Sequence, residues 1–438
     1  MFLIKHRMLL VLFVFPVVTL FAAEPWTGLE QARERINKIR KAELGVRVFD
    51  ADGNPLPDAN VTVSMQKHAF PFGCAISATN AFTPEGPDPD MQTYLEIFQE
   101  NFNEAIIENG MKWTGMNNHD GSVNTLTRMK TWQCISWLER NDIPLRGTNV
   151  LWPSWQWSPK YLHDLRLQPE ILKREIDRHV DEALNMYRGH LIDWDFVNEP
   201  VHHRDFINIF GRDIMIDWYK RAHELNPKTN MYVNQWAVLN DVYHNGFKKW
   251  IRYLLAHPET SLDGIGIQGH MTVEQCTDST TLAAVWSKLN EYAEFGLPIK
   301  ITEYDVEGFR GEDLQAEALK NALTLFFSHP AVQGFTIWGF WDGRHWRNMP
   351  QFSFAGVNEK AGFWRQDWSE KPAAKTWQRL IFDEWWTQVS GQTDEDNGTF
   401  RTRGFLGDYQ IMVVYNNNMQ TTSLSLSHDG ARVRVEFP

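Results

Sequence analysis

A regular alternation that begins near Ala69 constrains the fold of this 438-residue chain more than any other feature. Short runs rich in β-branched and aromatic residues are separated by longer segments with helical periodicity, such as Pro169–Tyr187 and Leu314–His329. This alternation predicts parallel strands joined by crossover helices, an α/β fold. Eight such units predict a closed (β/α)8 TIM barrel over residues 69–386. The predicted strands are Phe70–Ile76, Glu104–Ile107, Leu145–Trp152, Ile192–Asn198, Met231–Asn234, Gly264–Gln268, Ile299–Thr302 and Gly334–Trp338. Glu104–Ile107 is the weakest of them, and a helix is its alternative.

The segments on either side of this alternation are predicted to form small antiparallel β elements. In residues 24–68, the helical spacing of Leu29–Leu44 leads into two alternating stretches around the turn residues Asp52–Pro55, which predicts a helix and a strand–turn–strand unit. A helix at Ala373–Trp386 precedes a second β module at residues 387–438. Because about 50 residues are few for independent folding, a structural accessory is favoured. The alternatives are one sandwich shared with the N-terminal strands and a separate sugar-binding module.

The first 23 residues have the pattern of a secretory signal peptide. Lys5 and Arg7 precede the apolar run Met8–Leu20, and small residues follow at Ala22 and Ala23. At about 13 residues the run is shorter than a typical membrane span, although an uncleaved anchor is the alternative. We therefore expect a secreted protein, extracellular or periplasmic, without membrane attachment after cleavage. Loss of the two basic residues lowers the formal net charge from −12 to about −14, which argues against a nucleic-acid partner.

The cysteines and tryptophans indicate two further features of the protein. The three cysteines, Cys74, Cys134 and Cys276, lie far apart without metal-ligand spacing, so buried free thiols are expected. Many of the 20 tryptophans stand beside Pro, Asn or Asp, where an indole can serve as a stacking surface for a sugar. The other interpretation of these tryptophans is core filling.

Two of the predicted strands end in a glutamate. Glu199 follows Ile192–Asn198, and Glu303 follows Ile299–Thr302. Active sites of (β/α)8 barrels are built at the carboxyl ends of the strands, so both side chains are expected in one cleft. Two facing carboxyl groups can cleave a glycosidic bond, because one protonates the leaving oxygen while the other attacks the anomeric carbon or activates water. A surface salt bridge is the alternative for either residue alone.

The residues around both glutamates resemble glycoside hydrolase family 10, the endo-β-1,4-xylanase family. WDFVNEP at residues 194–200 resembles the acid/base signature of that family, and ITEYD at residues 301–305 resembles its nucleophile signature. The resemblance covers roughly residues 45–435 and is greatest for the plant-type branch and its bacterial relatives. It implies Glu199 as acid/base, Glu303 as nucleophile and Asp305 in a supporting role.

The resemblance also implies a set of substrate-binding residues. ENGMKW at residues 108–113 resembles a segment that contacts glycone-side sugars, and QGH at residues 268–270 resembles the motif beside the nucleophile. WGFWDGRHW at residues 338–346 resembles a run whose two indoles wall the subsite next to the cleaved bond. Asn198 is expected to bond the sugar 2-OH. The substrate-binding residues predicted in this way are Glu108, Asn109, Lys112, Trp152, Asn198, Gln268, His270, Trp338 and Trp346.

Two departures from the family pattern bear on the substrate. RGTNVLW at residues 146–152 keeps Trp152 but has Thr148 where the family has a histidine that contacts the sugar at the cleavage subsite. NQW at residues 234–236 replaces the family's NDY. Thr148 in particular makes the identity of the sugar less certain than the type of reaction.

The sequence therefore predicts a retaining hydrolase that cleaves internal β-1,4-xylosidic bonds of xylan by double displacement. The alternatives are the same chemistry on another β-glycan or a decorated xylan, and a non-catalytic glycan-binding barrel. A polysaccharide partner, a monomeric state and no cofactor are expected. His202 and His203 follow Glu199, but no carboxylate or histidine completes a metal-ligand set with the pair, so no metal is expected.

Overall fold

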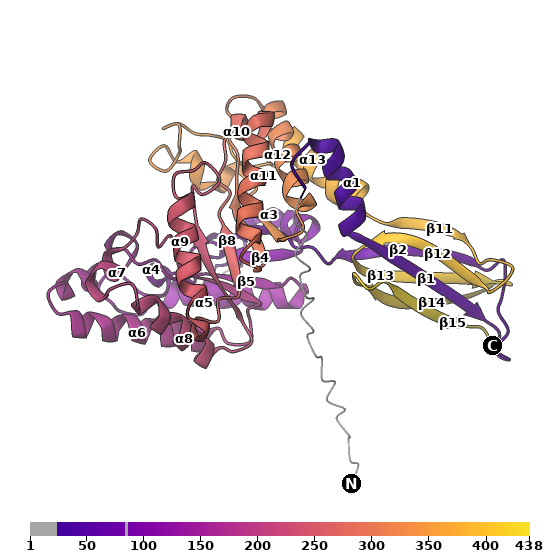
Figure 1. The fold of residues 1–438 in the computed structure, drawn as a ribbon, viewed down its shortest axis with the longest axis horizontal. Helices are drawn as coiled ribbons and strands as arrows, with labels where there is room; N and C mark the ends of the chain where they lie inside the picture. Colours follow the sequence, from indigo (N-terminus) through magenta and orange to yellow (C-terminus); the bar gives the residue numbers. More distant parts are fainter. Residues whose placement is uncertain (1–23, 84–85) are drawn as a thin grey trace, which may run out of the picture.

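The structure, a computed structural model, describes residues 24–83 and 86–438, so the predicted signal peptide lies outside the described residues. Eight parallel strands close into a barrel with helices around it (Figure 1). The strands are β3 (Phe72–Ile76), β4 (Glu104–Ile107), β5 (Leu145–Leu151), β6 (Asp193–Asn198), β7 (Asn230–Gln235), β8 (Gly264–Ile267), β9 (Ile299–Tyr304) and β10 (Val332–Ile337). The predicted (β/α)8 barrel is confirmed, and Glu104–Ile107 is a strand.

The helices around the barrel bury one stripe of each surface. In α6 (Pro169–Met186), Pro169 occupies the first turn, and Leu172, Ile176 and Val180 recur at four-residue spacing on the buried side. The other helices of this ring are α2 (Ala78–Ala81), α3 (Pro89–Asn101), α4 (Trp113–Met116), α5 (Thr125–Arg140), α7 (Asp205–Phe210), α8 (Ile214–Leu225), α9 (His244–Leu255), α10 (Val273–Thr277), α11 (Ser279–Ala293), α12 (Glu312–Ser328) and α13 (Pro372–Arg379). A π-helical turn at Leu380–Glu384 extends α13.

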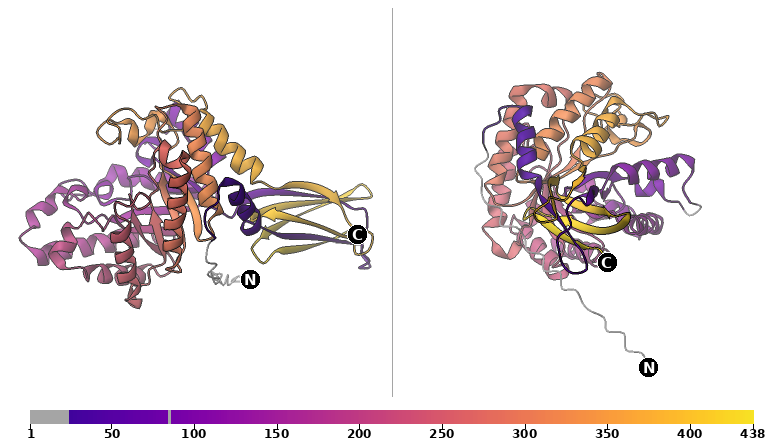
Figure 2. Two further views of the ribbon diagram at one scale, coloured as in Figure 1. Left: turned by 45° about the horizontal axis from the view of Figure 1, so that its top comes forward. Right: turned by 90° about the vertical axis from the view of Figure 1, so that its right-hand side faces the viewer.

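Strands from both ends of the chain share the two sheets of a sandwich beside the barrel (Figure 2). One sheet has the order β12-β1-β15 and the other the order β11-β2-β13-β14. The strands are β1 (Lys41–Phe49), β2 (Asn60–His68), β11 (Gln388–Gln392), β12 (Thr399–Phe405), β13 (Gly407–Tyr415), β14 (Asn418–Leu426) and β15 (Ala431–Glu436). All pairings are antiparallel except that of β1 with β15, which is parallel.

Two details of the N-terminal segment differ from the sequence reading. Helix α1 spans Leu29–Ile39, and the strand begins at Lys41 rather than after Leu44, because alternation of buried and exposed side chains takes over there. β1 and β2 also do not pair with each other as a strand–turn–strand unit would suggest. Each instead pairs with strands from the other end of the chain, which bury more apolar surface than an isolated hairpin can.

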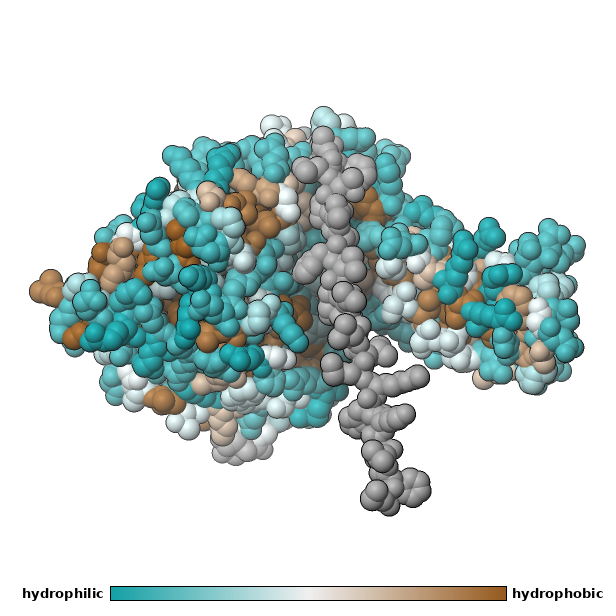
Figure 3. Space-filling view, turned by 60° about the horizontal axis from the view of Figure 1, so that its bottom comes forward, coloured by the Kyte–Doolittle hydropathy of each residue, from teal (hydrophilic) through white to brown (hydrophobic). Residues whose placement is uncertain are grey.

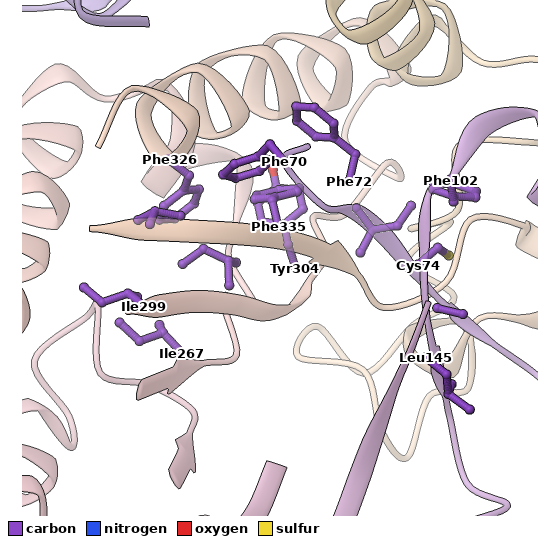
Figure 4. Close-up of a cluster of buried hydrophobic side chains, with 14 of the residues drawn as sticks. Phe70, Phe72, Cys74, Phe102, Leu145, Ile267, Ile299, Tyr304, Phe326 and Phe335 are labelled. Carbon is purple, nitrogen blue, oxygen red and sulfur yellow. The ribbon is translucent and has the colours of Figure 1, made fainter. Parts of the chain in front are cut away.

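The sandwich meets the barrel at an aromatic cluster beside the start of β3, where the rings of Phe405 of β12 and Phe327 of α12 have centroids 6.4 Å apart. Phe70 and Phe72 pack with ring centroids 4.9 Å apart, and both contact Phe327 of α12. Figure 4 shows Phe70 and Phe72 close to Phe335 of β10. The buried guanidinium of Arg40 lies over the Phe70 ring and donates to three backbone carbonyls, those of Phe327, His329 and Val332. Since β2 leads directly into β3, the sandwich adjoins the amino-terminal end of that strand.

The surface of the protein is mostly hydrophilic, and its cysteines are buried. On the face seen in Figure 3, hydrophilic residues cover most of the barrel and the sandwich, with smaller hydrophobic patches among them. Cys74, Cys134 and Cys276 are buried free thiols, as expected. Among the residues placed by the structure, no helix combines the length and the apolar character needed to span a membrane.

A network of buried charges fills the barrel interior. Lys300 Nζ lies 2.9 Å from Glu104 Oε2 and 2.7 Å from Asp193 Oδ2. Arg146 pairs with Asp193 and, at 2.9 Å, with Asp195. Burial raises the pKa of Asp195 to about 7, although Arg146 opposes the shift. Three acids meet two bases here, so Asp195 balances the charge of the interior when it is protonated, below this pKa.

Candidate active site

A cleft of about 410 Å³ opens at the carboxyl ends of the barrel strands. It brings together every residue of the predicted site except Asp305, which lies one layer behind Glu303. Its lining residues are Glu108, Asn109, Lys112, Thr148, Asn149, Trp152, Trp157, Asn198, Glu199, His202, His203, Trp236, Gln268, His270, Glu303, Trp338, Trp346, Met349, Phe352 and Phe354. Residues from all parts of the barrel sequence therefore converge on one cavity.

Glu303, near the end of β9, is held between a neutral donor and an imidazole. Asn234 Nδ2, from the end of β7, donates to Glu303 Oε1 at 2.8 Å. Thr302 Oγ1 donates to Asn234 Oδ1 at 2.8 Å, so the orientation of the amide is set. On the other side, His270 Nε2 lies 3.4 Å from Glu303 Oε2. Glu303 therefore contacts an amide N–H on one side and an imidazole on the other.

The charge of His270 is set by Asp305. Asp305 Oδ2 lies 3.0 Å from His270 Nδ1, and the same carboxylate pairs with Arg347 and accepts from Trp346 Nε1. Burial lowers the pKa of His270, but the Asp305 carboxylate and the contact with Glu303 outweigh it and raise the pKa to about 9. At neutral pH a cationic imidazole therefore faces Glu303.

Glu199 occupies a turn directly after β6. Its backbone has a φ of 57°, which is uncommon for a residue with a side chain, and its N–H donates to the carbonyl of Asn234 at 2.8 Å. This turn directs the carboxyl group into the cleft. Gln268 Nε2 donates to Oε1 at 2.7 Å and Trp152 Nε1 donates to Oε2 at 3.2 Å. Backbone strain at a side chain of this kind is typical of functional sites.

Two histidines crowd the same carboxyl group. His202 Nε2 and His203 Nε2 lie 3.1 Å and 3.3 Å from Glu199 Oε2. Burial raises the pKa of Glu199, but if both imidazoles donate, their hydrogen bonds and that of Gln268 lower the pKa to about 2. The hydrogen bonds of these rings and of Gln268 thus act on the charge state of Glu199 against the effect of burial.

A chain of amides links the two glutamates. Gln268 Nε2, which donates to Glu199, also contacts Asn198 Oδ1 at 3.4 Å. Asn234 Nδ2, which donates to Glu303, donates to Asn198 Oδ1 as well, at 3.0 Å. Since Asn198 Oδ1 accepts from both sides, its Nδ2 group is the one oriented to donate to a ligand in the cleft.

Aromatic rings form the walls of the cleft. Trp152 and Trp157 stack with centroids 4.3 Å apart and planes 12° apart. Lys112 Nζ lies 5.6 Å from the Trp152 ring and 5.5 Å from the Trp338 ring, and it donates to Asn109 Oδ1 at 3.0 Å. Indole faces match the apolar C–H faces of pyranose rings, while the polar groups between them can bond the hydroxyls.

The neighbourhood of Glu199 corrects one step of the sequence argument about metals. The ligand-type atoms of Glu199, His202 and His203 lie within 4.8 Å of one another, so a carboxylate does stand beside the histidine pair. An indole N–H, however, points at His202 Nε2 from 3.0 Å and at His203 Nε2 from 3.2 Å, which leaves little room for a metal at either atom. We therefore assign no metal ligands here, and the absence of a metal stays a prediction.

Several residues that line the cleft lie outside the predicted site. Asn234 ends a predicted strand, which is the signal that led to Glu199 and Glu303. His202 and His203 form only a metal-type pattern in the sequence, and Trp236 stands in NQW, which departs from the family pattern. Trp157 carries no local signal. Thr148 is buried in β5 and lines the cleft where the family histidine is expected.

Comparison with known proteins identifies the family. Residues 61–379 match the model of glycosyl hydrolase family 10. The chain belongs to this family. The resemblance found in the sequence is thereby confirmed, and plant proteins are among the relatives.

The chain is similar to proteins considerably longer than itself. It is 29% identical over 395 residues to anti-sigma-I factor RsgI6 of Acetivibrio thermocellus, which covers 89% of this chain and 47% of that protein. It is 27% identical over 404 residues to endo-1,4-beta-xylanase 1 of Arabidopsis thaliana, covering 90% of this chain and 39% of that protein. The chain thus spans less than half the length of either relative.

Among solved structures, xylanase 10B from Thermotoga petrophila RKU-1 in complex with xylobiose has a TM-score of 0.63 and 21% sequence identity. The match covers 72% of this chain and 95% of that one. At this identity the likeness establishes the shared fold.

Proposed function

We propose that this chain is a retaining endo-β-1,4-xylanase in which Glu303 is the nucleophile and Glu199 the acid/base. The observation that carries the proposal is the amide chain through Gln268, Asn198 and Asn234, which holds the two carboxyl groups in one cleft. Family membership supports a glycosidase, and the xylanases among its relatives support xylan as the substrate.

The first step forms a glycosyl-enzyme. The Glu303 carboxylate bonds to the anomeric carbon while the bond from that carbon to the leaving oxygen breaks, and the Glu199 proton passes to that oxygen. In the second step Glu199 takes a proton from water, and the water oxygen bonds to the anomeric carbon. The bond from that carbon to Glu303 breaks, and Glu303 is released as a carboxylate. The cationic His270 and the Asn234 amide N–H both contact Glu303, which supports its proposed role as nucleophile.

The same chemistry on a decorated xylan or another β-glycan is the second candidate, and Thr148 favours it. A threonine leaves more room than a histidine at this place in the cleft, so a sugar substituent has space there. Trp152, Trp338 and the other cleft aromatics suit any β-1,4-linked glycan.

Assays of reducing-sugar release from purified polysaccharides test the proposal. Unsubstituted xylan, glucuronoxylan, arabinoxylan and mixed-linkage glucan should be compared for the wild type, Glu303→Gln and Glu199→Gln. We expect the wild type to cleave xylan internally with retention at the anomeric carbon, and Glu303→Gln to be inactive. Cleavage of glucan alone contradicts the xylan assignment. Binding without cleavage by the wild type indicates a glycan-binding barrel instead.

An aryl glycoside with a good leaving group separates the roles of the two glutamates. Because such a leaving group departs without protonation, Glu199→Gln should retain formation of the glycosyl-enzyme while Glu303→Gln does not. Equal loss in both variants would contradict the assignment of acid and nucleophile.

We also propose that the chain is exported and that the signal at residues 1–23 is removed. Expression of the full chain, followed by N-terminal sequencing of the exported product, tests this. A product that retains Met1 or stays in the membrane fraction argues for an uncleaved anchor. Light scattering of the same product tests the predicted monomer.

A further inference from the structure

Arginines gather on the outer face of the sheet β12-β1-β15, which is one layer of the sandwich (Figure 1). In β1, Leu44, Val46 and Val48 are buried toward the second sheet, so Gly45 and Arg47 lie on the outer face. The strands on both sides add exposed arginines to this face, namely Arg401 and Arg403 of β12 and Arg432 and Arg434 of β15. The face is thus rich in positive charge, whereas the chain as a whole has a formal net charge of −12.

The register of the three strands places a hollow between these arginines. Gly45 stands opposite Arg401 on one side and opposite Arg432 on the other. Because Gly45 has no side chain, the face is open above it, and a cavity of about 570 Å³ lies there. Its lining residues are Glu43, Leu44, Gly45, Arg47, Asn397, Thr399, Arg401, Asp429, Gly430, Ala431 and Arg432. This arginine hollow therefore has a glycine at its floor and arginine side chains at its walls.

The arginines that line the hollow lack acidic partners. Arg403 and Arg434, which lie outside it, pair with glutamates of the same sheet at 3.5 Å and 2.5 Å. Within the part of the chain that the structure describes, Arg47, Arg401 and Arg432 form no ion pair. One lining acid, Glu43, is the partner of Arg403, so its charge is offset from outside the hollow.

The arrangement of these charges is unfavourable for the sheet by itself. Arg47 and Arg434 stand at facing positions of neighbouring strands, where like charges destabilise a sheet. Both guanidinium groups lie over the ring of Phe49, at 5.0 Å and 3.8 Å from its centroid, which holds them in place. An anion bound beside them would relieve the repulsion.

The groups around the hollow match an acidic sugar. A guanidinium group can donate two parallel N–H bonds to the two oxygens of a carboxylate. Asn397 and Asp429, at the edge of the hollow, can bond hydroxyl groups. A uronic acid presents both a carboxylate and hydroxyls. Nucleic acid fits less well, because its charges recur every 1.7 Å or so, roughly, and the net charge of −12 on the chain repels such a dense polyanion.

We propose that the arginine hollow binds a uronic acid substituent of xylan. The inference rests on the proposed function for the choice of xylan as the chain that carries the acid. The sandwich adjoins the amino-terminal end of β3, whereas the cleft opens at the carboxyl ends of the barrel strands. The hollow therefore holds a part of the polysaccharide away from the bond that is cleaved, and it acts on affinity for the polymer.

Binding of two matched polymers tests the proposal. The full chain carrying Glu303→Gln, which leaves the polymer intact, is titrated with glucuronoxylan and with the same glucuronoxylan after its carboxyl groups have been reduced to alcohols. We expect the acidic polymer to bind about 10-fold more tightly, the equivalent of one hydrogen bond to a charged group. Arg401→Gln combined with Arg432→Gln should abolish this difference. Equal binding of both polymers by the parent, or an unchanged difference in the double variant, overturns the proposal.

Two further variants separate a site in the hollow from diffuse attraction to positive charge. Gly45→Leu fills the hollow while every arginine stays, and its Cβ would meet Arg432 Cγ at 3.4 Å, an ordinary contact. It should also abolish the preference for the acidic polymer, and a retained preference overturns the proposal. Arg174→Gln removes the same charge from an exposed position of α6 and should bind as the parent does. A loss there as large as in the double variant likewise overturns it.

Hydrolysis by the chain with Glu303 intact keeps this inference separate from the proposed function. The double variant should raise the KM for glucuronoxylan about 10-fold more than the KM for the carboxyl-reduced polymer. An equal rise for both polymers overturns the inference. Hydrolysis of xylan without any preference in binding for the acidic polymer overturns this inference alone. Preferential binding of the acidic polymer without hydrolysis of any xylan overturns only the proposed function.

Discussion

Replacing Asn234 with aspartate tests the arrangement around the proposed nucleophile. The substitution exchanges the Nδ2 donor, 2.8 Å from Glu303 Oε1, for an oxygen of the same size. Loss of a hydrogen bond to a charged group costs about 1.5–3 kcal/mol, which is about 10- to 150-fold in kcat/KM. The new carboxyl group adds repulsion, because two carboxyls at this distance cannot both ionise readily. We therefore expect at least about a 100-fold loss and a rise of the acid limb by about one unit or more.

The assay is the pH dependence of kcat/KM for the polysaccharide and for an activated aryl glycoside. Both substrates should lose activity equally, since both need attack by Glu303. Asn234→Ala should lose less and shift the acid limb less, because it adds no charge. The exposed Asn185 of α6 provides the control, and Asn185→Asp should behave as the wild type. An acid limb that does not move in Asn234→Asp would refute the reasoning.

Three further substitutions test the barrel interior and the cleft. Lys300→Met leaves Glu104 and Asp193 without their ammonium partner and should lower the free energy of unfolding in urea at pH 7 by about 3–5 kcal/mol. An unchanged midpoint of urea unfolding would contradict a stabilising role for these ion pairs. Asp195 has a pKa of about 7 in the folded protein, whereas the same group in the unfolded chain titrates near about 3.9. The free energy of unfolding should therefore decrease as the pH rises from about 3.9 to about 7. Asp195→Asn should remove this decrease. The same slope in the variant would exclude Asp195 as its source. Thr148→His should raise kcat/KM on undecorated xylan about five-fold through one added hydrogen bond and lower it on decorated xylan, whereas equal effects on both would argue against a role in substrate choice.

The barrel strands and the shared location of the two glutamates could be predicted from local sequence patterns. Hydrophobic runs and helical periodicity identified all eight barrel strands, because each βα unit has its own short-range signal. Closure of the barrel places the ends of all strands on one face, so Glu199 and Glu303 could be assigned to one cleft from their positions at strand ends. The predicted helix extended to Leu44, but the helix ends at Ile39 and the strand begins at Lys41. Helical and strand periodicity overlap in these few residues, so the sequence pattern does not locate the boundary.

Tertiary structure decided what surrounds those glutamates. The donors to Glu303 and Glu199, the contact of the Trp236 indole with His202, and the ion pairs of Lys300 each join side chains from different strands and loops. The sandwich likewise pairs strands more than three hundred residues apart. Periodicity in a single segment reports which face of that segment is buried. It carries no information about which side chain from another segment will lie opposite, and that pairing determines the charge and proton of each group in the cleft.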